Sequence, residues 1–262
     1  MPLAKQQLHR IEPLLRTIRN SAFAAGIDVG VIKSGRNSGQ HGVSFVSQEA
    51  MTAADNHAVF RTMAKEIAAQ QGMSITFLAA YDEQHENACH VQLSLRAEDG
   101  SAALYHKDQR TKLDDSFLAG VLATLANFTL FYAPNVNSYK RLRRESSAPA
   151  SIASVARVEN RLAGADVNLY LALAAMIAGG LYGIDHDLEL GPALAGSTAS
   201  TEFPKVPDTL RAAREAFSSS EIARTAFGDE VVDHYTALAD AELAAFESAV
   251  TNWEIRRGIE RM

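Results

Sequence analysis

The 262-residue sequence is poor in cysteine and in tryptophan, with one residue of each. The single cysteine, Cys89, cannot form a disulfide within the chain, and such sparing use of cysteine suits a reducing compartment. Without a cysteine cluster, a zinc site built from several thiolates is excluded. We therefore expect a cytoplasmic protein that is stabilised by its core rather than by cross-links.

Long apolar runs are missing as well. The longest, residues 169–184 (LYLALAAMIAGGLYGI), has 16 residues with three glycines, which is short of the ~20 apolar residues that span a bilayer. We interpret it as a buried helix. The first residues, MPLAKQQLHRIEPLL, lack the basic end, the apolar core and the small-residue cleavage site of a signal peptide. We expect neither membrane contact nor export.

The chain also has no excess of basic residues. It carries 25 lysines and arginines against 31 acidic residues, for a net charge of −6, which argues against a general nucleic-acid binder. No Walker-type phosphate loop, Rossmann fingerprint or G-x-S-x-G nucleophile motif is present. Hydrophobic residues make up 47% of the sequence, which is enough for the core of one large domain or two small ones.

The pattern of apolar residues predicts both helices and strands. Helical spacing predicts helices over residues 1–25, 50–71, 116–132, 169–184, 210–219, 220–226 and 229–257. Gly26 and Gly72 follow the first two as C-caps. Alternating segments predict strands over residues 27–32, 43–46, 74–81 and 89–96. Because helices and strands do not alternate regularly, the pattern favours the α+β class.

Residues 133–170 contain a dense group of charged residues whose spacing indicates a possible site. A basic run that includes Arg143 and Arg144 leads to RVENR, in which Arg157, Glu159 and Arg161 alternate as on one face of a strand. The pattern alone favours a solvated, salt-bridged strand face. The alternative is a strand that lines an anionic, metal-bearing pocket.

A second polar face is expected in the segment CHVQLSL. His90, Gln92 and Ser94 would share one face of a strand, while Val91 and Leu93 would share the other. The polar face is either the exposed side of an ordinary half-buried strand or a set of ligands, since histidine binds metal ions and phosphate.

Several segments together resemble the catalytic domain of the glutamine synthetase family. They are NSYKR, the following Ala-Pro, RVENR and GADVNLYLALAAMIAGGLYGI, and the similarity is greatest to the bacterial branch that joins glutamate to amines other than ammonia. The resemblance runs from about Ile11 to the C-terminus. It implies a glutamine synthetase/guanidino kinase-type fold, with an antiparallel sheet flanked by helices, in a single catalytic domain over residues 1–262. The family's N-terminal β-grasp domain, and the strand with a Glu-x-Glu metal-binding pair, are expected to be absent.

The resemblance also implies roles for particular residues. His90 and Glu159 match metal ligands. Arg161 matches an arginine near the phosphate, and Gln92 stands where the family has a second histidine beside the nucleotide phosphates. Ser94 shares that face and is assigned with them to nucleotide binding.

One further residue is assigned to the substrate. Arg141 in NSYKR matches the arginine that holds the carboxylate of glutamate, a task that suits the guanidinium fork. Asn137 and Tyr139 are expected to be structural.

The chain departs from the family pattern at several positions. The segment Gly39-Gln40-His41-Gly42 resembles a loop whose last residue is a metal-binding glutamate, and Gly35 stands at a further glutamate ligand. On their own, these glycines indicate a flexible loop. A strand's length of chain between Ala153 and Val155 is expected to be missing, and Ser147 replaces a flap glutamate.

The family reaction implied by the resemblance joins glutamate to ammonia or an amine, with ATP and Mg²⁺ or Mn²⁺. Because only His90 and Glu159 remain of the metal ligands, we expect weak or absent binding of ATP and metal and impaired chemistry. The alternative is an inactive remnant or assembly module. A guanidino kinase is a third, less favoured reading. The family also implies a homo-oligomer.

Overall fold

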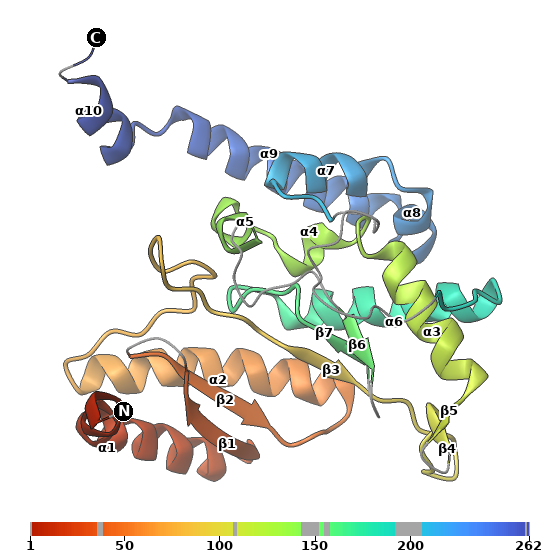
Figure 1. The fold of residues 1–262 in the computed structure, drawn as a ribbon, viewed down its shortest axis with the longest axis horizontal. Coiled ribbons are helices and arrows are strands. Elements are labelled where there is room, and N and C mark those ends of the chain that lie inside the picture. The colour runs from red at the N-terminus through yellow and green to blue at the C-terminus, as the bar shows by residue number, and fades with distance from the viewer. Residues whose placement is uncertain are drawn as a thin grey trace.

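A computed structural model describes residues 2–35, 39–106, 109–142, 152–154, 158–191, 206–259 and 261 (Figure 1). Its helices are α1 (Pro2–Ala24), α2 (Ala50–Gln70), α3 (Lys112–Thr124), α4 (Thr129–Tyr132), α5 (Val136–Leu142), α6 (Leu169–Asp185), α7 (Leu210–Ser218), α8 (Glu221–Phe227), α9 (Asp229–Ser248) and α10 (Asn252–Gly258). Its strands are β1 (Val29–Ser34), β2 (His41–Phe45), β3 (Val91–Leu93), β4 (Tyr105–His106), β5 (Gln109–Arg110), β6 (Ile152–Ser154) and β7 (Val158–Asn160).

The strands form three small antiparallel sheets, so the α+β prediction is confirmed. β1 pairs with β2 and β4 with β5, while the third sheet has the order β3-β7-β6. In that sheet Gln92 lies opposite Glu159, and Leu93 lies opposite Val158. Residues more than sixty positions apart in the sequence are thereby brought side by side at the centre of the molecule.

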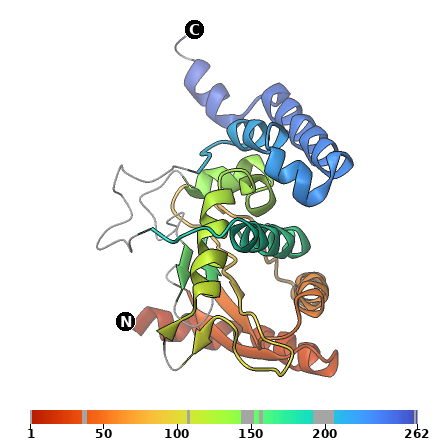
Figure 2. The same cartoon turned by 90° about the vertical axis from the view of Figure 1, so that its right-hand side faces the viewer.

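Two apolar clusters hold the layers together. The smaller lies where α1 and α2 cover the β1–β2 sheet, and it includes Ile18, Ile27 and Phe60. The larger joins β3 and β7 to α3, α6 and the C-terminal helices. In both ribbon views α6 runs between α2 on one side and the α7–α9 layer on the other (Figures 1 and 2). Helix α6 is therefore held between two helical layers.

The closest helix contact in the core is made by glycines. α6 is the buried apolar helix that the sequence predicts, and it crosses α3 where Gly120 faces Gly179 and Gly183. A Cβ atom on Gly183 would lie 2.7 Å from the Cα atom of Gly120. Because the atoms that this Cβ would meet belong to the backbone of α3, they cannot move aside as a side chain could. The absence of side chains at these positions sets the distance between the two helices.

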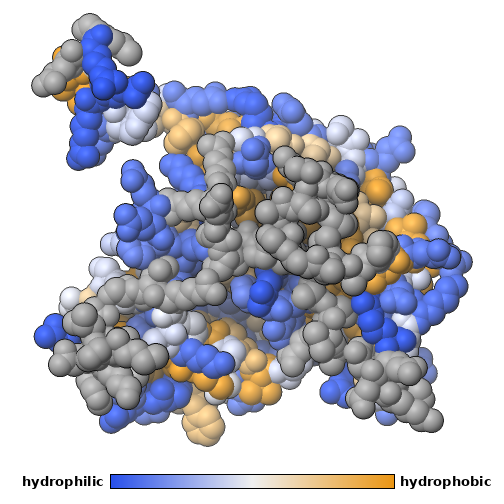
Figure 3. All heavy atoms as spheres, viewed as in Figure 1, coloured by the Kyte–Doolittle hydropathy of each residue, from blue (hydrophilic) through white to orange (hydrophobic). Residues whose placement is uncertain are grey.

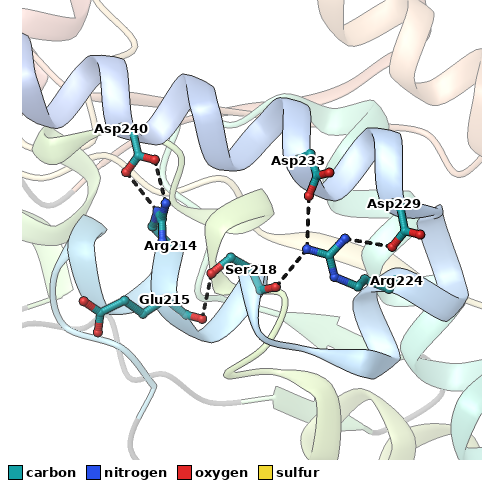
Figure 4. Close-up of polar contacts among 7 residues, drawn as sticks. All are labelled: Arg214, Glu215, Ser218, Arg224, Asp229, Asp233 and Asp240. Carbon is teal, nitrogen blue, oxygen red and sulfur yellow. Dashed lines mark hydrogen bonds and ion pairs between the residues drawn. The ribbon is translucent and has the colours of Figure 1, made fainter.

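The C-terminal helices α7, α8 and α9 form a layer of their own (Figure 4). Arg214 of α7 makes a two-fold contact with Asp240 of α9, at 2.8 and 2.7 Å. Arg224 of α8 bonds to Asp229 and Asp233 at 2.7 and 3.0 Å. In the space-filling view the outer edge of this layer is mostly hydrophilic, with apolar residues beneath it (Figure 3). These ion pairs fix the helix register over an apolar underside.

Several expected elements differ from those observed. No strand spans residues 74–81 in the described chain, where only Ala80 forms a single bridge, with Glu86. At Ala80 the side chain of Asn137 takes both backbone groups, at 3.0 and 2.9 Å, so these groups are not available to a neighbouring strand. The expected helix over residues 116–132 is broken into α3 and α4, and the long C-terminal helix is broken into α9 and α10.

The break before α10 has a local cause. Thr251 accepts a hydrogen bond from the backbone N–H of Glu254, and the Glu254 carboxylate accepts one from the backbone N–H of Thr251. This capping box starts a new helix at Asn252. The strand expected over residues 89–96 is also shorter, since β3 covers only Val91–Leu93. Among the described helices none is long and apolar enough to cross a membrane.

The glycine crossing yields a stability prediction. Replacing Gly120 by alanine would push its Cβ into the backbone of α6, and we expect the free energy of unfolding to fall by about 1–3 kcal/mol. Gly191→Ala is the matched control, because a Cβ there meets nothing within 4 Å. Urea unfolding of both variants checks this, and equal stability of Gly120→Ala and the wild type would contradict the close crossing.

A second prediction concerns acid stability. Burial of His57 on α2, and then the charge of Arg61 one turn away, lower the pKa of this imidazole from 6.5 to about 4. The neutral ring therefore stabilises the fold above pH 6.5, and this contribution is lost as the pH falls towards 4. In His57→Gln the acid-induced loss of stability should be smaller by about 2 kcal/mol. Urea unfolding at pH 7 and 4.5 measures the difference, and equal losses in both proteins would disprove it.

Candidate active site

The candidate site is the polar face of the β3–β7 ladder. Val91 and Leu93 of β3 point into the core, with 4% and 8% exposure, whereas Gln92 points outward. On β7, Val158 and Asn160 are buried and Glu159 lies on the other face. The pairing register places Gln92 directly opposite Glu159. The alternation expected from the sequence is thus observed on both strands, and it brings their polar residues together.

Glu159 is the centre of this face. Its Oε1 atom lies 3.1 Å from Nδ1 of His90 and 3.4 Å from Nε of Arg161. Gln92 donates a hydrogen bond from Nε2 to the same oxygen, at 3.4 Å. The Glu159 side chain is only 17% exposed, while those of His90 and Arg161 are each 40% exposed. One carboxylate oxygen therefore holds three of the side chains that the sequence assigns to the site.

The electrostatics of the cluster favour an ionised carboxylate beside a neutral imidazole. Partial burial tends to raise the pKa of Glu159, but the hydrogen bond from Gln92 and the charge and hydrogen bond of Arg161 outweigh it, and the pKa lies below its ordinary value. Burial and the Arg161 charge lower the pKa of His90, against the opposing effect of Glu159. The negative charge of Glu159 is therefore balanced by Arg161 rather than by an imidazolium.

Arg141 lies behind the cluster rather than in it. Its side chain is 2% exposed, and its two Nη groups donate to the carbonyl oxygens of Leu162 and Arg161, at 2.9 and 3.0 Å. Burial lowers its pKa, against the opposing charges of Glu86 and Asp166. The Nε atom is buried without a hydrogen-bond partner. In this structure Arg141 braces the chain where it leaves β7, and its binding to a substrate carboxylate stays a prediction.

The other residues that the sequence analysis associated with the site lie outside the Glu159 cluster. Ser94 is exposed, one residue beyond the end of β3. Gly42 pairs with Lys33 in the β1–β2 hairpin, and a Cβ there would meet only the carbonyl oxygen of Lys33, at 4.0 Å. Gly35 is different, because a Cβ there would lie 2.5 Å from the side-chain oxygen of Gln40. A larger residue has room at position 42, whereas at position 35 it requires the side chain of Gln40 to shift.

Some expected features lie outside the described residues. They are Arg143, Arg144, Ser147, Arg157 and the junction after Ser154. A cavity of about 270 Å³ lies between α5, α7 and α9 and is lined by Tyr139 and Phe246 among others. None of the residues around Glu159 lines that cavity.

The site residues fit a divalent metal poorly. Within the described part of the chain, no group of three or more His, Cys, Asp or Glu residues is placed to hold a metal ion. His90 and Glu159 supply one imidazole and one carboxylate, and Oε1 of that carboxylate is already in contact with three donors. Mg²⁺ prefers an octahedral set of hard oxygen ligands. The described residues alone do not provide one.

Two residues near the site, Asp166 and Asn87, were not singled out from the sequence, and Gln40 was named only as part of the segment from Gly39 to Gly42. Asp166 accepts hydrogen bonds from Asn135 and Ser138 through Oδ2, at 2.9 and 2.6 Å, and so holds the start of α5. Gln40 and Asn87 hydrogen-bond to each other across 47 positions. Single polar residues in loops carry no periodic signal, so only the structure could identify these contacts.

The cluster yields a prediction on stability. In Glu159→Gln the anion that balances Arg161 is lost, and we expect the free energy of unfolding to fall by about 1 kcal/mol at pH 7, after allowing for screening by solvent. Because the pKa of Glu159 is lowered, this contribution is present above pH 4.5 and is lost as the pH falls further. Urea unfolding in metal-free buffer measures it. Glu242→Gln, on the exposed face of α9, is the control and should match the wild type.

Comparison with known proteins identifies the family to which the chain is similar. The family model for the glutamine synthetase catalytic domain matches residues 3–155 and 150–258, two segments that overlap at residues 150–155. A gamma-glutamylethanolamide synthetase of Streptomyces coelicolor is 46% identical over 97% of this chain and 58% of its own length. A glutamate–isopropylamine ligase of a Pseudomonas species is 32% identical, over 94% and 59%.

Solved structures agree with the same assignment. A structure described as "Apo GmaS without ligand" superposes with a TM-score of 0.87 at 26% identity, over 97% of this chain and 64% of that one. A GmaS/ADP complex gives 0.88 at 25% identity, over 97% and 65%. The chain thus spans about three fifths of the length of its relatives. By the family match and by the fold, the chain belongs to the glutamine synthetase family and corresponds to its catalytic domain.

Proposed function

We propose that this chain is one catalytic domain, over residues 1–262, of an ATP-dependent glutamate–amine ligase that forms gamma-glutamyl amides. The observation that carries the proposal is the convergence of His90, Gln92 and Arg161 on Glu159. These are the positions at which the resemblance places metal- and phosphate-binding residues. Relatives named for ethanolamide synthesis and for isopropylamine ligation favour an amine as the second substrate.

The reaction of this class has two steps. The γ-carboxylate of glutamate attacks the terminal phosphorus of ATP, which releases ADP and forms an acyl phosphate. The amine nitrogen then attacks the acyl carbon and phosphate leaves, while the amine loses a proton. The first step brings an anion against a polyanion, so its rate depends on groups that neutralise and position charge.

The described residues meet only part of that requirement. Arg161 is the charged group on the open face, and Gln92 and Ser94 add neutral hydrogen-bond donors beside it. Arg141 would hold the glutamate carboxylate, but two of its donors are taken by backbone carbonyls. We therefore propose that ATP and Mg²⁺ or Mn²⁺ bind weakly to this chain and that its ligase activity is impaired.

Two biological roles are compatible with this arrangement. The missing ligands could come from a further polypeptide in a homo-oligomer, in which case the chain takes part in catalysis. Alternatively, the chain is a non-catalytic assembly module that keeps the family fold. The three protein contacts that Glu159 Oε1 already makes favour the second role, whereas the retained pairing of His90 with Glu159 favours the first.

Calorimetric titration with Mg²⁺–ATP tests the proposal. We expect weak binding to the wild type and at least a tenfold loss of affinity in His90→Ala, which is a loss of about 1.4 kcal/mol in binding free energy. His234→Ala, on the exposed face of α9, is the control and should bind as the wild type does. Release of phosphate in the presence of glutamate and ethanolamine or isopropylamine then tests the reaction.

The outcome separates the two roles. If the folded protein gives no heat of binding with Mg²⁺–ATP, a ligase site in this chain alone is excluded and the assembly module remains. A second variant, Gly42→Glu, restores a carboxylate where the structure has room. It should strengthen Mn²⁺ binding if the site is a damaged enzyme site, and it should have no effect on a scaffold.

A further inference from the structure

The side chain of Gln40 connects the β1–β2 hairpin to the segment that leads into β3. Its Nε2 group donates to the carbonyl oxygen of Glu86, at 2.6 Å, and to Oδ1 of Asn87, at 2.9 Å. The backbone carbonyl oxygen of Gln40 accepts a hydrogen bond from the backbone N–H of Gly35, at 2.8 Å. Gln40 is therefore held at both ends, and one amide joins two parts of the chain.

Asn87 in turn forms hydrogen bonds to two further segments of the chain. Its side chain donates to the carbonyl oxygen of Leu78, at 2.9 Å, and its backbone N–H donates to Ala79, at 2.8 Å. Its carbonyl oxygen accepts from the N–H of Ala165, at 3.1 Å. Two residues on, Cys89 donates to the carbonyl oxygen of Ala163, at 3.0 Å. The segment before β3 is thus joined to the segment after β7.

These contacts gather at one end of the β3–β7 ladder. Because the strands are antiparallel, the start of β3 lies beside the end of β7. His90 directly precedes β3, and Arg161 directly follows β7. Arg141 holds the β7 side through the carbonyl oxygens of Arg161 and Leu162. Gln40 holds the β3 side through Glu86 and Asn87, so the end that carries the site is braced twice.

The place of Gln40 also restricts position 35. A Cβ atom on Gly35 would lie 2.5 Å from Oε1 of Gln40 and 2.8 Å from both its Cδ and its Cγ atoms. A Cβ atom does not approach other heavy atoms this closely, so a side chain at position 35 requires Gln40 to shift. We expect that shift to disturb the contacts of the Gln40 amide with Glu86 and Asn87.

We propose that Gln40 is a positioning residue that sets the place of His90 against Glu159, and that glycine at position 35 is required for it. In this chain the loop contributes a brace to the site where a carboxylate would otherwise stand. The inference rests on the proposed function only in taking the Glu159 cluster as the reactive site.

The first experiment follows His90 directly. Gln40→Met keeps the length of the side chain and removes its hydrogen bonds, and Gln71→Met is the matched control, since Gln71 also joins two elements, through Oγ1 of Thr17, at 3.1 Å. NMR of the His90 imidazole at fixed pH, in chelator and without nucleotide, should show a shifted resonance in Gln40→Met only. An unchanged His90 resonance in folded Gln40→Met would overturn the proposal.

The second experiment tests the link to position 35. Gly35→Ala should lower the melting temperature of the wild type by about 3 °C and should have little effect in a Gln40→Ala background, where the obstructing side chain is gone. Equal effects in both backgrounds would show that Gln40 does not occupy the space above Gly35. Neither readout uses ATP or turnover, so failure of the proposed function and failure of this inference are distinguishable.

Discussion

A buried guanidinium is the constraint on which the central part of the structure depends. Arg141 is almost fully enclosed, and a charge removed from water must find acceptors or the fold loses several kcal/mol. It finds them in two backbone carbonyls at the end of β7. The same helix carries Asn137, whose amide holds Ala80. A short helix of seven residues thereby fixes both the strand that bears Glu159 and the chain that approaches β3.

The cluster around Glu159 shows how such a scaffold can change its use. A carboxylate that faces one arginine, one imidazole and one amide is already neutralised and solvated by the protein. To bind a divalent cation it would have to give up some of these contacts. The more completely a site balances its own charge, the smaller its remaining attraction for metal and phosphate. The residues that carry the resemblance to a ligase family are thus also the residues that balance each other's charge in this chain.

Much of the local structure could be predicted from the residues. Alternation in HVQLS and RVENR predicted which side chains would face outward, because successive residues on a strand point to opposite sides. The apolar run from Leu169 predicted the buried helix α6. The segment 74–81 was predicted wrongly as a strand, because its apolar pattern could not reveal that Asn137 would take the backbone groups of Ala80. The break at Thr251 had a readable signal, the Thr-x-x-Glu capping box, which was missed.

The sequence by itself determined the α+β class, most of the helices and the faces on which His90, Gln92 and Glu159 lie. It did so because these depend on periodicity and on local propensity, which act over a few residues. Only the tertiary structure decided that Gln92 pairs with Glu159, that Gln40 reaches Asn87 and that Gly120 meets Gly183. Each of these joins positions tens of residues apart, and strand register and helix contact are set by the packing of the whole core.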